Sequence, residues 1–372
     1  MTRDTFTMPH TYQDHLIQQI RLSDDRDLLY FFDRGSGSIL DSPDDRRDPF
    51  PRPHHPQMRY DALTGEWISV AADRNQRAHL PATDQCPLCP QSKTNLSEIP
   101  HRFDVAVFEN RNPSFSPGSE MAGDDPNGQA PFGVSSPAVG RCEVVVFSPE
   151  HRGSFASQSI DRLRTIYVAW QHRTEDLLGM PGVKTVFPFE NRGEDIGVTL
   201  HHPHGQIYGY PYVPPTLKKI LQSSRTFGPG FFSAFLDYET GSPRLIHQGE
   251  SFTAFVPFAA RWPLEVMVFP HREIGLLTEL SDSERDEAAS IHQRILQGFD
   301  SLYDSETPYI SGWYQSPRGV SGSAMRLHLK MFSPRRAANK LKFLAGSESA
   351  MGAFISDVAP ETQAANLRSV LS

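Results

Sequence analysis

The sequence predicts an α+β protein made of two similar halves, each with an antiparallel sheet and flanking helices. The chain of 372 residues is long enough for two domains with buried cores. Its content of 38% hydrophobic and 22% charged residues is typical of a globular protein. Two β-rich segments, residues 143–152 and 265–272, resemble each other, and a helical pattern follows each of them. We interpret this as an internal duplication, with chance similarity of two strand–turn–helix units as the alternative.

Before the first half, residues 1–57 are predicted to be a mobile lead-in. Residues 34–57 are rich in Gly, Ser, Pro and charged side chains and show no hydrophobic period. Order is expected to begin near Arg59. A second polar stretch, residues 116–138, is rich in Pro and Gly and predicts a long loop.

The first half is predicted to span residues 58–225 and the second residues 226–372. In the first half a β-rich run is followed by a helix whose apolar residues recur with a period near 3.6. These residues are Ile160, Leu163, Ile166, Tyr167, Trp170, Leu177 and Leu178. In the second half a helix is expected from Ser281 to about Tyr303, because Ser281 and Glu284 have the spacing of a capping box.

The charge and cysteine content exclude several classes of protein. A net charge of −8 argues against general nucleic-acid binding, which needs a basic face. No apolar run is long enough to cross a membrane, and the first residues lack the apolar core of a secretory signal. Only three cysteines occur, two of them three residues apart, so we expect a reduced, cytoplasmic location.

The segment around His204 is the richest in chemistry. If residues 198–208 form a strand, His202, His204 and Gln206 point to the same face. Pro203 removes one backbone donor, which predicts a strand at an edge or leaving the sheet. Gly205 allows another group to approach the backbone closely.

This pattern favours transfer of a phosphorus-containing group. A neutral imidazole nitrogen can attack phosphorus and form a covalent intermediate, which splits one displacement into two. The other ring nitrogen must keep its proton. The amide of Gln206 can donate to a phosphate oxygen but is a poor acid at pH 7, so it favours an intermediate that waits for a second acceptor over hydrolysis.

Several motifs, in order, resemble those of galactose-1-phosphate uridylyltransferases, in the histidine-triad superfamily. The resemblance runs from about Arg59 to the C-terminus. It is carried by residues 59–68, Arg74, Arg77, residues 86–89, 108–113, 147–151, 191–206 and 342–348. It implies two histidine-triad-like halves, of which only the first keeps the catalytic histidine.

The resemblance implies an activity and a set of site residues. His204 would attack the α-phosphorus of UDP-glucose, release glucose 1-phosphate and carry the uridylyl group to galactose 1-phosphate, giving UDP-galactose. Gln206 would hold the phosphoryl oxygens. Residues implied to bind the nucleotide and phosphates are Arg74, Arg77, Asn110, Asn191 and Thr199, the last in place of a family serine. An arginine fork suits phosphate.

The C-terminal half would contribute to sugar binding. Lys342, Phe343 and Glu348 match the family segment that contacts the hexose. A carboxylate such as that of Glu348 can accept from two sugar hydroxyls. In the family this segment reaches the catalytic half of the partner subunit, which implies a homodimer.

Cys86 and Cys89 have the spacing of two ligands of one Zn²⁺, which needs four. The resemblance supplies His151 and His202 as the others. Since His202 lies two residues from His204, we expect zinc to support the nucleophile structurally. The alternative is a pair of buried free thiols. Cys142 is expected in the core.

Some family members carry a second metal site, and here its ligands are replaced. Tyr314 and Lys330 stand where histidines would be, and His328 remains. A lysine could supply positive charge in place of a metal, so we predict no iron.

Three alternatives remain. A related nucleotidylyltransferase would use an ADP-sugar or a dinucleoside polyphosphate. A histidine-triad hydrolase is disfavoured by Gln206. A zinc-dependent binding or scaffold protein is disfavoured because it has no need of both His204 and Gln206.

Overall fold

The structure, a computed structural model, describes residues 8–36, 40, 45–48, 56–72, 74, 80–118 and 132–371. It is an α+β protein whose strand pairs are antiparallel, as predicted. The chain forms two compact units that interleave in sequence. Unit 1 holds residues 1–153, 161–187 and 202–218, and unit 2 holds residues 154–160, 188–201 and 219–372. The predicted division at residue 225 is therefore too simple, because the chain passes between the units several times.

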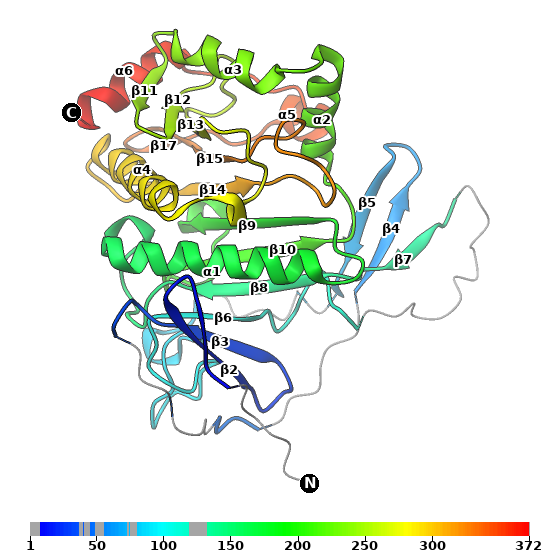
Figure 1. Cartoon of the computed structure of the whole chain (residues 1–372), viewed down its shortest axis with the longest axis vertical. Helices are drawn as coiled ribbons and strands as arrows, with labels where there is room; N and C mark the ends of the chain where they lie inside the picture. Colours follow the sequence, from blue (N-terminus) through cyan, green and yellow to red (C-terminus); the bar gives the residue numbers. More distant parts are fainter. Residues whose placement is uncertain are drawn as a thin grey trace. The chain divides into compact units, whose positions relative to one another are not determined.

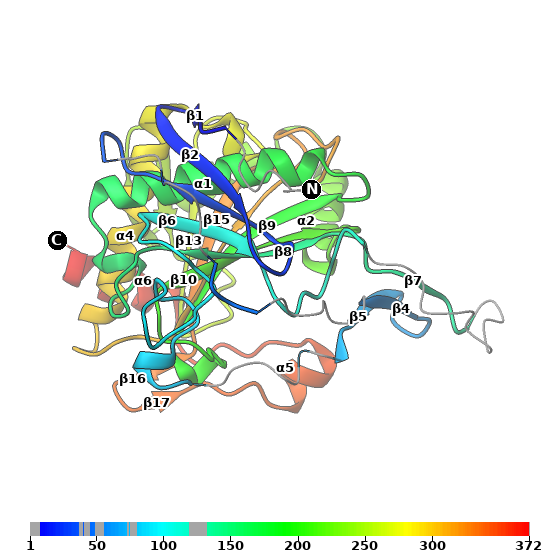
Figure 2. The ribbon, with the colours of Figure 1, turned by 90° about the horizontal axis from the view of Figure 1, so that it is seen from below.

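The main sheet of unit 1 has the strand order β1-β2-β3-β6-β8-β10, followed by the first residues of β9. Its strands are β1 (His10–Tyr12), β2 (His15–Arg21), β3 (Asp27–Phe31), β6 (Val105–Glu109), β8 (Arg141–Val146), β9 (Thr185–Arg192) and β10 (His204–Tyr210). Helix α1 (Ile160–Gly179) lies along one face of this sheet (Figure 2). Arg173 of α1 donates two hydrogen bonds to the buried carboxylate of Glu143 on β8, at 2.8 and 2.9 Å.

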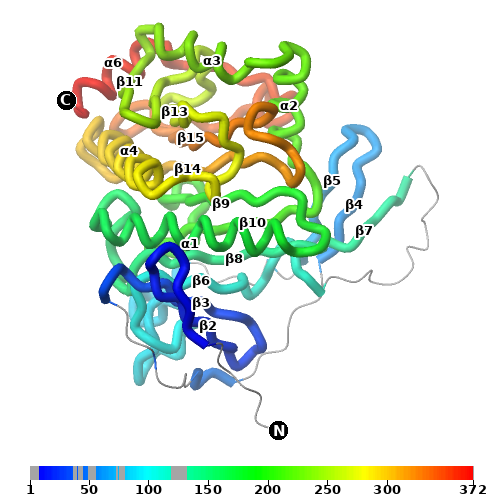
Figure 3. Tube along the Cα trace, in the orientation of Figure 1, coloured from blue at the N-terminus to red at the C-terminus, as the bar shows by residue number. Residues whose placement is uncertain are grey.

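The prediction that residues 1–57 are a mobile lead-in is wrong for residues 10–31. They form β1, β2 and β3, and β3 pairs with β6 (Figure 3). Ile17, Leu28 and Phe31 are fully buried. The apolar residues of β2 do not alternate, and Ile17 and Ile20 are buried from opposite faces of the strand. Residues 35–36 and 45–48 are also described. The rest of the predicted polar lead-in, residues 1–7, 37–39, 41–44 and 49–55, lies outside the described residues.

A small three-stranded sheet, ordered β5-β4-β7, extends from the rest of unit 1 (Figure 1). Its strands are β4 (Gln57–Asp61), β5 (Glu66–Val70) and β7 (Ser135–Pro137). Met58 of β4 packs in a core with Phe115, Ala138 and Cys142, which confirms the expected core position of Cys142. The predicted loop of residues 116–138 therefore ends in a strand, and its residues 119–131 lie outside the described residues.

Unit 2 contains the later residues of β9 and a sheet that continues in the order β14-β15-β13-β12-β11. Its strands are β11 (Leu245–Gln248), β12 (Phe252–Phe255), β13 (Leu264–Pro270), β14 (Tyr309–Tyr314), β15 (His328–Ser333) and the hairpin of β16 (Arg335–Ala337) and β17 (Lys340–Leu341). Its helices are α3 (Phe231–Thr240), α4 (Asp282–Ser301), α5 (Gly346–Met351) and α6 (Pro360–Leu371), while α2 (Pro215–Phe227) starts in unit 1 and ends in unit 2.

Helix α4 begins where the capping box predicted. The Ser281 side chain accepts from the Glu284 amide at 3.3 Å, and Glu284 accepts from the Ser281 amide at 2.8 Å. These bonds satisfy two backbone donors that a helix start leaves without partners. The helix ends at Ser301, two residues before the predicted end.

The two units repeat one chain path. In unit 1 the strands lie in the order β6-β8-β10-β9, and helix α1 follows β8 in the chain. In unit 2 the corresponding strands lie in the order β12-β13-β15-β14, and helix α4 follows β13. This repeated path agrees with the predicted duplication. The two matched glutamates differ, however, because Glu143 bonds to helix α1 whereas Glu265 forms an ion pair with Lys330 of the neighbouring strand at 2.6 Å.

Across the described ranges, no helix combines the length and the apolar character that a membrane crossing requires.

Candidate active site and metal centre

Strand β10 begins at His204, six residues later than predicted. Residues 198–203 have no strand geometry, so His202 does not lie on the strand. Pro203, which has no backbone donor, stands immediately before its first residue. His204 lies opposite Val146 of β8 and Gln206 opposite Val144. Because alternate strand residues share a face, the His204 and Gln206 side chains do point the same way, as predicted.

The His204 ring is held in one tautomer. Its Nδ1 lies 2.7 Å from the carbonyl oxygen of His202. A carbonyl can only accept, so Nδ1 carries the proton and Nε2 carries the lone pair. Burial lowers the pKa of His204 below its usual value, and the His202 carbonyl opposes this in part. The ring is therefore neutral near pH 7 and has a nucleophilic Nε2.

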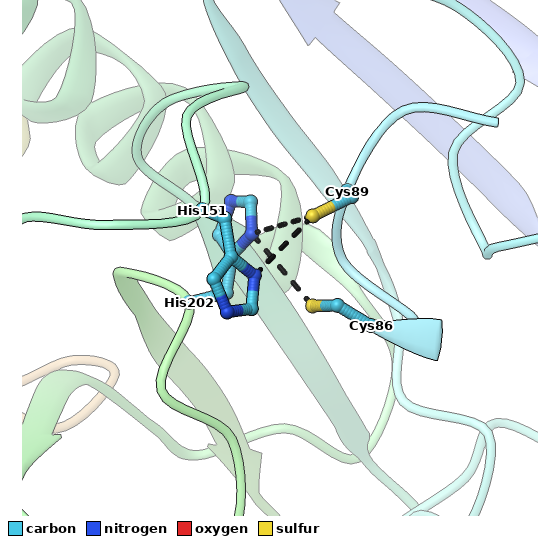
Figure 4. Close-up of side chains that lie close together, drawn as sticks. All are labelled: Cys86, Cys89, His151 and His202. Carbon is cyan, nitrogen blue, oxygen red and sulfur yellow. Dashed lines mark hydrogen bonds between the residues drawn. The ribbon is translucent and has the colours of Figure 1, made fainter. Parts of the chain in front are cut away.

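Two cysteines and two histidines gather beside this strand. Their four ligand atoms all lie within 4.8 Å of one another, and Figure 4 shows the side chains turned toward a common point. Cys86 and Cys89 follow a 3₁₀ turn (Thr83–Gln85), His151 follows β8, and His202 precedes β10. The Sγ atom of Cys89 is 3.4 Å from Nδ1 of both histidines, and that of Cys86 is 3.8 Å from Nδ1 of His202.

These distances fit a tetrahedral zinc site. Zinc–sulfur and zinc–nitrogen bonds of ordinary length place neighbouring ligand atoms about 3.6 Å apart. His202 donates from Nε2 to the carbonyl oxygen of Ser148 at 2.8 Å, which turns its Nδ1 lone pair toward the cysteines. Burial, and then the charge of Cys86, raises the pKa of the Cys89 thiol to about 12. Two cysteines and two histidines at these distances could hold a metal ion, and this set of donors is consistent with zinc.

His202 joins the metal cluster to His204. Its ring faces the two cysteines, while its own carbonyl oxygen accepts the proton of His204 Nδ1. A shift of this residue would therefore change both the metal geometry and the orientation of the His204 ring. The family resemblance suggested His202 as a metal ligand, but the sequence did not reveal its contact with His204, because a backbone carbonyl leaves no signal in the sequence.

The predicted phosphate-binding residues of unit 1 come together in part. Asn110 follows the end of β6, and its Oδ1 accepts from the amide of Asn112 at 3.0 Å. The Arg74 guanidinium donates to the carbonyl oxygen of that same Asn112 at 3.3 Å. Arg74 and Asn110 therefore belong to one local cluster. Arg77 lies outside the described residues.

Asn191 and Thr199 lie in unit 2. Asn191 is on β9 and lies opposite Ile310 of β14. Thr199 lies in the irregular segment between the 3₁₀ turn Glu194–Ile196 and β10, and it is partly buried.

The predicted sugar-contacting residues form a compact group next to helix α5. Nζ of Lys342 lies 3.1 Å from Glu348 Oε1 and 3.6 Å from Asp357. The bond from Lys342 lowers the pKa of Glu348. Both polar side chains are buried, whereas Phe343 is 76% exposed. Phe343 is thus the member of this group that is most open to a ligand.

The three positions of the replaced second metal site also lie together in unit 2. The His328 ring is stacked between Phe269, at 4.6 Å, and Tyr314, at 4.9 Å between ring centroids. Lys330 pairs with Glu265 at 2.6 Å. Glu265 was missed by the sequence reasoning, although a charged residue in the apolar run of β13 was a signal that it needs a buried partner.

Comparison with known proteins identifies the family of the chain. Residues 47–214 match the family model of the galactose-1-phosphate uridyl transferase N-terminal domain, and residues 236–372 match that of its C-terminal domain. A galactose-1-phosphate uridylyltransferase from Streptomyces lividans is 36% identical over 84% of this chain and 86% of its own length. One from Thermotoga maritima is 33% identical over 84% of this chain and 98% of its own.

The fold is shared with solved structures as well. A uridylyltransferase structure superposes with a TM-score of 0.75 at 30% identity and covers 85% of this chain and 98% of its own. An ADP-glucose phosphorylase from Arabidopsis thaliana shares the fold at 20% identity, with a TM-score of 0.63, covering 84% of this chain and 98% of its own. The two family models together match most of the sequence, and the chain therefore belongs to the galactose-1-phosphate uridyl transferase family.

Proposed function

We propose that this protein transfers the uridylyl group from UDP-glucose to galactose 1-phosphate through a covalent uridylyl intermediate on His204. The observation that carries the proposal is the hydrogen bond from His204 Nδ1 to the His202 carbonyl oxygen, which leaves the Nε2 lone pair for attack. The names of the relatives support the overall reaction, uridylyl transfer to galactose 1-phosphate. The geometry around His204 supports the covalent route.

The first half-reaction begins with attack of His204 Nε2 on the α-phosphorus of UDP-glucose. The N–P bond forms, the bond from the α-phosphorus to the bridging oxygen breaks, and glucose 1-phosphate leaves with that oxygen. Nδ1 keeps its proton and its bond to the His202 carbonyl oxygen, which stabilises the positive charge on the substituted ring. In the second half-reaction a phosphate oxygen of galactose 1-phosphate attacks phosphorus, UDP-galactose forms, and Nε2 regains its lone pair.

Gln206 is proposed to donate its amide hydrogens to the non-bridging oxygens of the reacting phosphate. It lies two residues beyond His204 on the same face of β10. Charge builds on those oxygens in the transition state, where a fixed donor lowers the barrier. Since an amide is not an acid at pH 7, it does not help water to displace histidine, which favours transfer over hydrolysis.

Cys86, Cys89, His151 and His202 would hold Zn²⁺, which when bound contributes a rigid tetrahedral support. His202 faces this cluster with its ring and holds the His204 proton with its carbonyl. The ion is thus proposed as structural, and its effect on the reaction is to fix the direction of the nucleophile.

The remaining contacts are proposed from the family. Arg74 and Asn110, which share Asn112 as a neighbour, would bind the nucleotide phosphates together with Arg77, Asn191 and Thr199. Lys342, Phe343 and Glu348 would contact the hexose across a homodimer. A cytoplasmic location is proposed on the same grounds, since both substrates are phosphorylated sugars of metabolism.

The mass of the intact protein tests the route. The protein is mixed with UDP-glucose alone, and a mass increase equal to one uridylyl group is expected. Addition of galactose 1-phosphate should remove the increment and yield UDP-galactose. The variant His204→Asn, treated in the same way, should show no increment.

Each other outcome has a clear meaning. If an increment appears only with an ADP-sugar or a dinucleotide, the covalent route stands and the uridylyl assignment is wrong. If the increment with UDP-glucose disappears in water without acceptor, the protein is a hydrolase. An increment of equal size on His204→Asn would place the intermediate on another residue.

A further inference from the structure

The loop that carries Cys86 and Cys89 is tied together by its own polar contacts. The amide of Glu98 donates to the carbonyl oxygen of Pro87, between the two cysteines, at 2.9 Å. The Asn95 side chain donates to the carbonyl oxygen of Cys86 at 2.8 Å. The loop thus closes on itself, and the side chain of Glu98 bonds to partners elsewhere in unit 1.

The nearest of these partners are two arginines from the N-terminal region, while Arg111 Nη1 lies farther away, at 3.8 Å from Glu98 Oε1. Nη1 of Arg47 donates to Glu98 Oε2 at 2.7 Å, and Nη2 of Arg26 bonds the same oxygen. Arg26 is only 4% exposed, in the turn between β2 and β3. It also donates to Asp24 at 2.6 and 2.9 Å and to the carbonyl oxygen of Glu109, the last residue of β6, at 2.8 Å.

A second link runs parallel to the first. Asp45 accepts from the Ser23 amide at 2.9 Å and from Gln91 Nε2 at 3.0 Å. Gln91 lies two residues after Cys89, and its backbone amide donates to the carbonyl oxygen of Ile99 at 2.8 Å. The Asp45 carboxylate receives three further bonds from Arg47, two from the guanidinium and one from the backbone amide at 3.3 Å. These bonds, with the Ser23 amide, outweigh its burial and lower its pKa.

We infer that Asp24, Arg26, Asp45 and Arg47 form a clamp that holds the cysteine loop in its ligating geometry, and that the clamp controls how tightly the metal is retained. Outer contacts that fix metal ligands commonly change metal affinity by about 10- to 100-fold. Here the fixed element is the loop rather than a single ligand. Arg26, with three kinds of partner at once, joins β6, the β2–β3 turn and Glu98. Asp24, Arg26 and Asp45 all precede residue 47, where the family-model match begins.

The inference rests on the metal centre proposed above, and its test uses the full chain loaded with zinc. The zinc-loaded protein is mixed with a coloured chelator, and the rate of zinc release is measured at constant pH. Arg26→Met, which removes the guanidinium and leaves Glu98 without one of its cations, should release zinc about 10-fold faster or more. Arg21→Met is the matched control, since Arg21 is on the same hairpin but pairs with Asp27 and, among the described residues, makes no hydrogen bond or ion pair with Glu98 or with the cysteine loop. It should release zinc at the wild-type rate.

A second control separates positioning from a general loss of stability. Leu177→Ala removes a fully buried side chain of α1 that takes no part in the clamp. If Leu177→Ala, at a similar loss of thermal stability, releases zinc as fast as Arg26→Met, the clamp has no specific role and the inference is overturned. If Arg26→Met does not fold, Glu98→Gln is measured against the same controls, with the same criterion.

The outcomes also distinguish this inference from the proposals on which it rests. A wild-type protein that binds no zinc overturns the metal centre and the clamp together. A wild-type protein that binds zinc, with release unchanged in Arg26→Met, overturns the clamp alone. Neither result depends on a sugar nucleotide, so the uridylyl-transfer proposal is judged separately.

Discussion

Each unit starts one strand with a histidine whose Nδ1 donates to the carbonyl two residues earlier. In unit 1, His204 donates to His202 at 2.7 Å, and in unit 2, His328 donates to Arg326 at 3.0 Å. The surroundings of the two rings differ. His204 is partly buried at the start of β10, whereas His328 is 3% exposed and packed between two aromatic rings. The same local backbone contact therefore holds the proposed nucleophile in one unit and a buried core histidine in the other.

The residues two positions before and two positions after each histidine also differ between the units. In unit 1 they are His202, which faces the metal cluster, and Gln206, which is proposed to hold phosphate. In unit 2 they are Arg326, which donates to Glu273 at 2.9 Å, and Lys330, which pairs with Glu265. Arg326 and Lys330 of unit 2 are thus each paired with a carboxylate of the same unit. The two strand starts thus share one backbone contact and differ in the residues that surround it.

The largest expected effect separates the two histidines. His204→Asn should lower uridylyl transfer on the order of 10⁴-fold or more, because it removes the attacking nitrogen, and should leave the fold intact. His328→Asn should leave the turnover number close to wild type and lower the free energy of unfolding by about 2 kcal/mol, through lost ring packing. Steady-state kinetics and urea unfolding of both variants make the comparison. Wild-type turnover by His204→Asn would end the assignment of the nucleophile.

The next effect concerns two buried cysteines. Cys86→Ser removes a proposed metal ligand and should lower the free energy of unfolding by about 4 kcal/mol or more, together with loss of bound zinc. Cys142→Ser, in the core beside Met58 and Phe115, should cost about 1–3 kcal/mol, from burying a hydroxyl, and leave zinc content unchanged. Metal analysis and urea unfolding are the measurements. Equal zinc content in the two variants would contradict the ligand assignment.

A third pair of variants compares the residues that follow each histidine. Gln206→Leu should lower transfer about 10²- to 10³-fold, the usual effect of removing one donor to a charged transition state, with little change in stability. Lys330→Met should instead lower the free energy of unfolding by about 3 kcal/mol, since Glu265 is left buried beside an apolar chain. Lys330→Met with Glu265→Gln should recover part of that loss. The comparison fails if Lys330→Met impairs transfer while its stability is unchanged.

The smallest expected effect is a pH dependence that belongs to unit 2. Burial lowers the pKa of His328 to about 4, below the ordinary value of about 6.5. As the pH falls below about 6.5, the unfolded chain binds a proton that the folded state excludes, so stability falls until the pH reaches about 4. The slope is about 1.4 kcal/mol per pH unit for this one group. Urea unfolding at pH 6 and pH 5 measures how much free energy of unfolding is lost between the two pH values. This loss should be about 1.4 kcal/mol smaller in His328→Phe than in wild type. Equal losses would show that His328 does not resist protonation.

The sequence predicts those parts of the fold in which local pattern and tertiary packing agree. The 3.6-residue period identified α1, and the Ser281–Glu284 capping box located the start of α4 correctly. Strands β1 to β3 were missed because their apolar runs are short and are followed by a polar stretch. Their order depends on partners distant in sequence, such as the Glu109 carbonyl oxygen that accepts from Arg26, 83 residues away.

In the candidate site, too, some features are visible in the local sequence and others depend on residues distant in the chain. The spacing of Cys86 and Cys89 is visible locally, but His151 and His202 lie 62 and 113 residues from Cys89. Without a known family, no local rule selects them from fifteen histidines. The strand start at His204 was misplaced because alternation of side chains through His202 suggested a longer strand. The chain instead turns His202 out of the strand toward the cysteines, a preference set by the cluster and not by the local sequence.

The double use of His202 has a consequence for how the protein responds to oxidants. No cysteine takes part in the proposed transfer, yet the ring of His202 is positioned beside Cys86 and Cys89 and its carbonyl orients His204. Oxidation of either thiol to a disulfide or a sulfenic acid removes a metal donor. The carbonyl that fixes the His204 tautomer then loses its support. We therefore expect peroxide and thiol-modifying reagents to inactivate the proposed transfer, and a reductant with added zinc to restore it after oxidation.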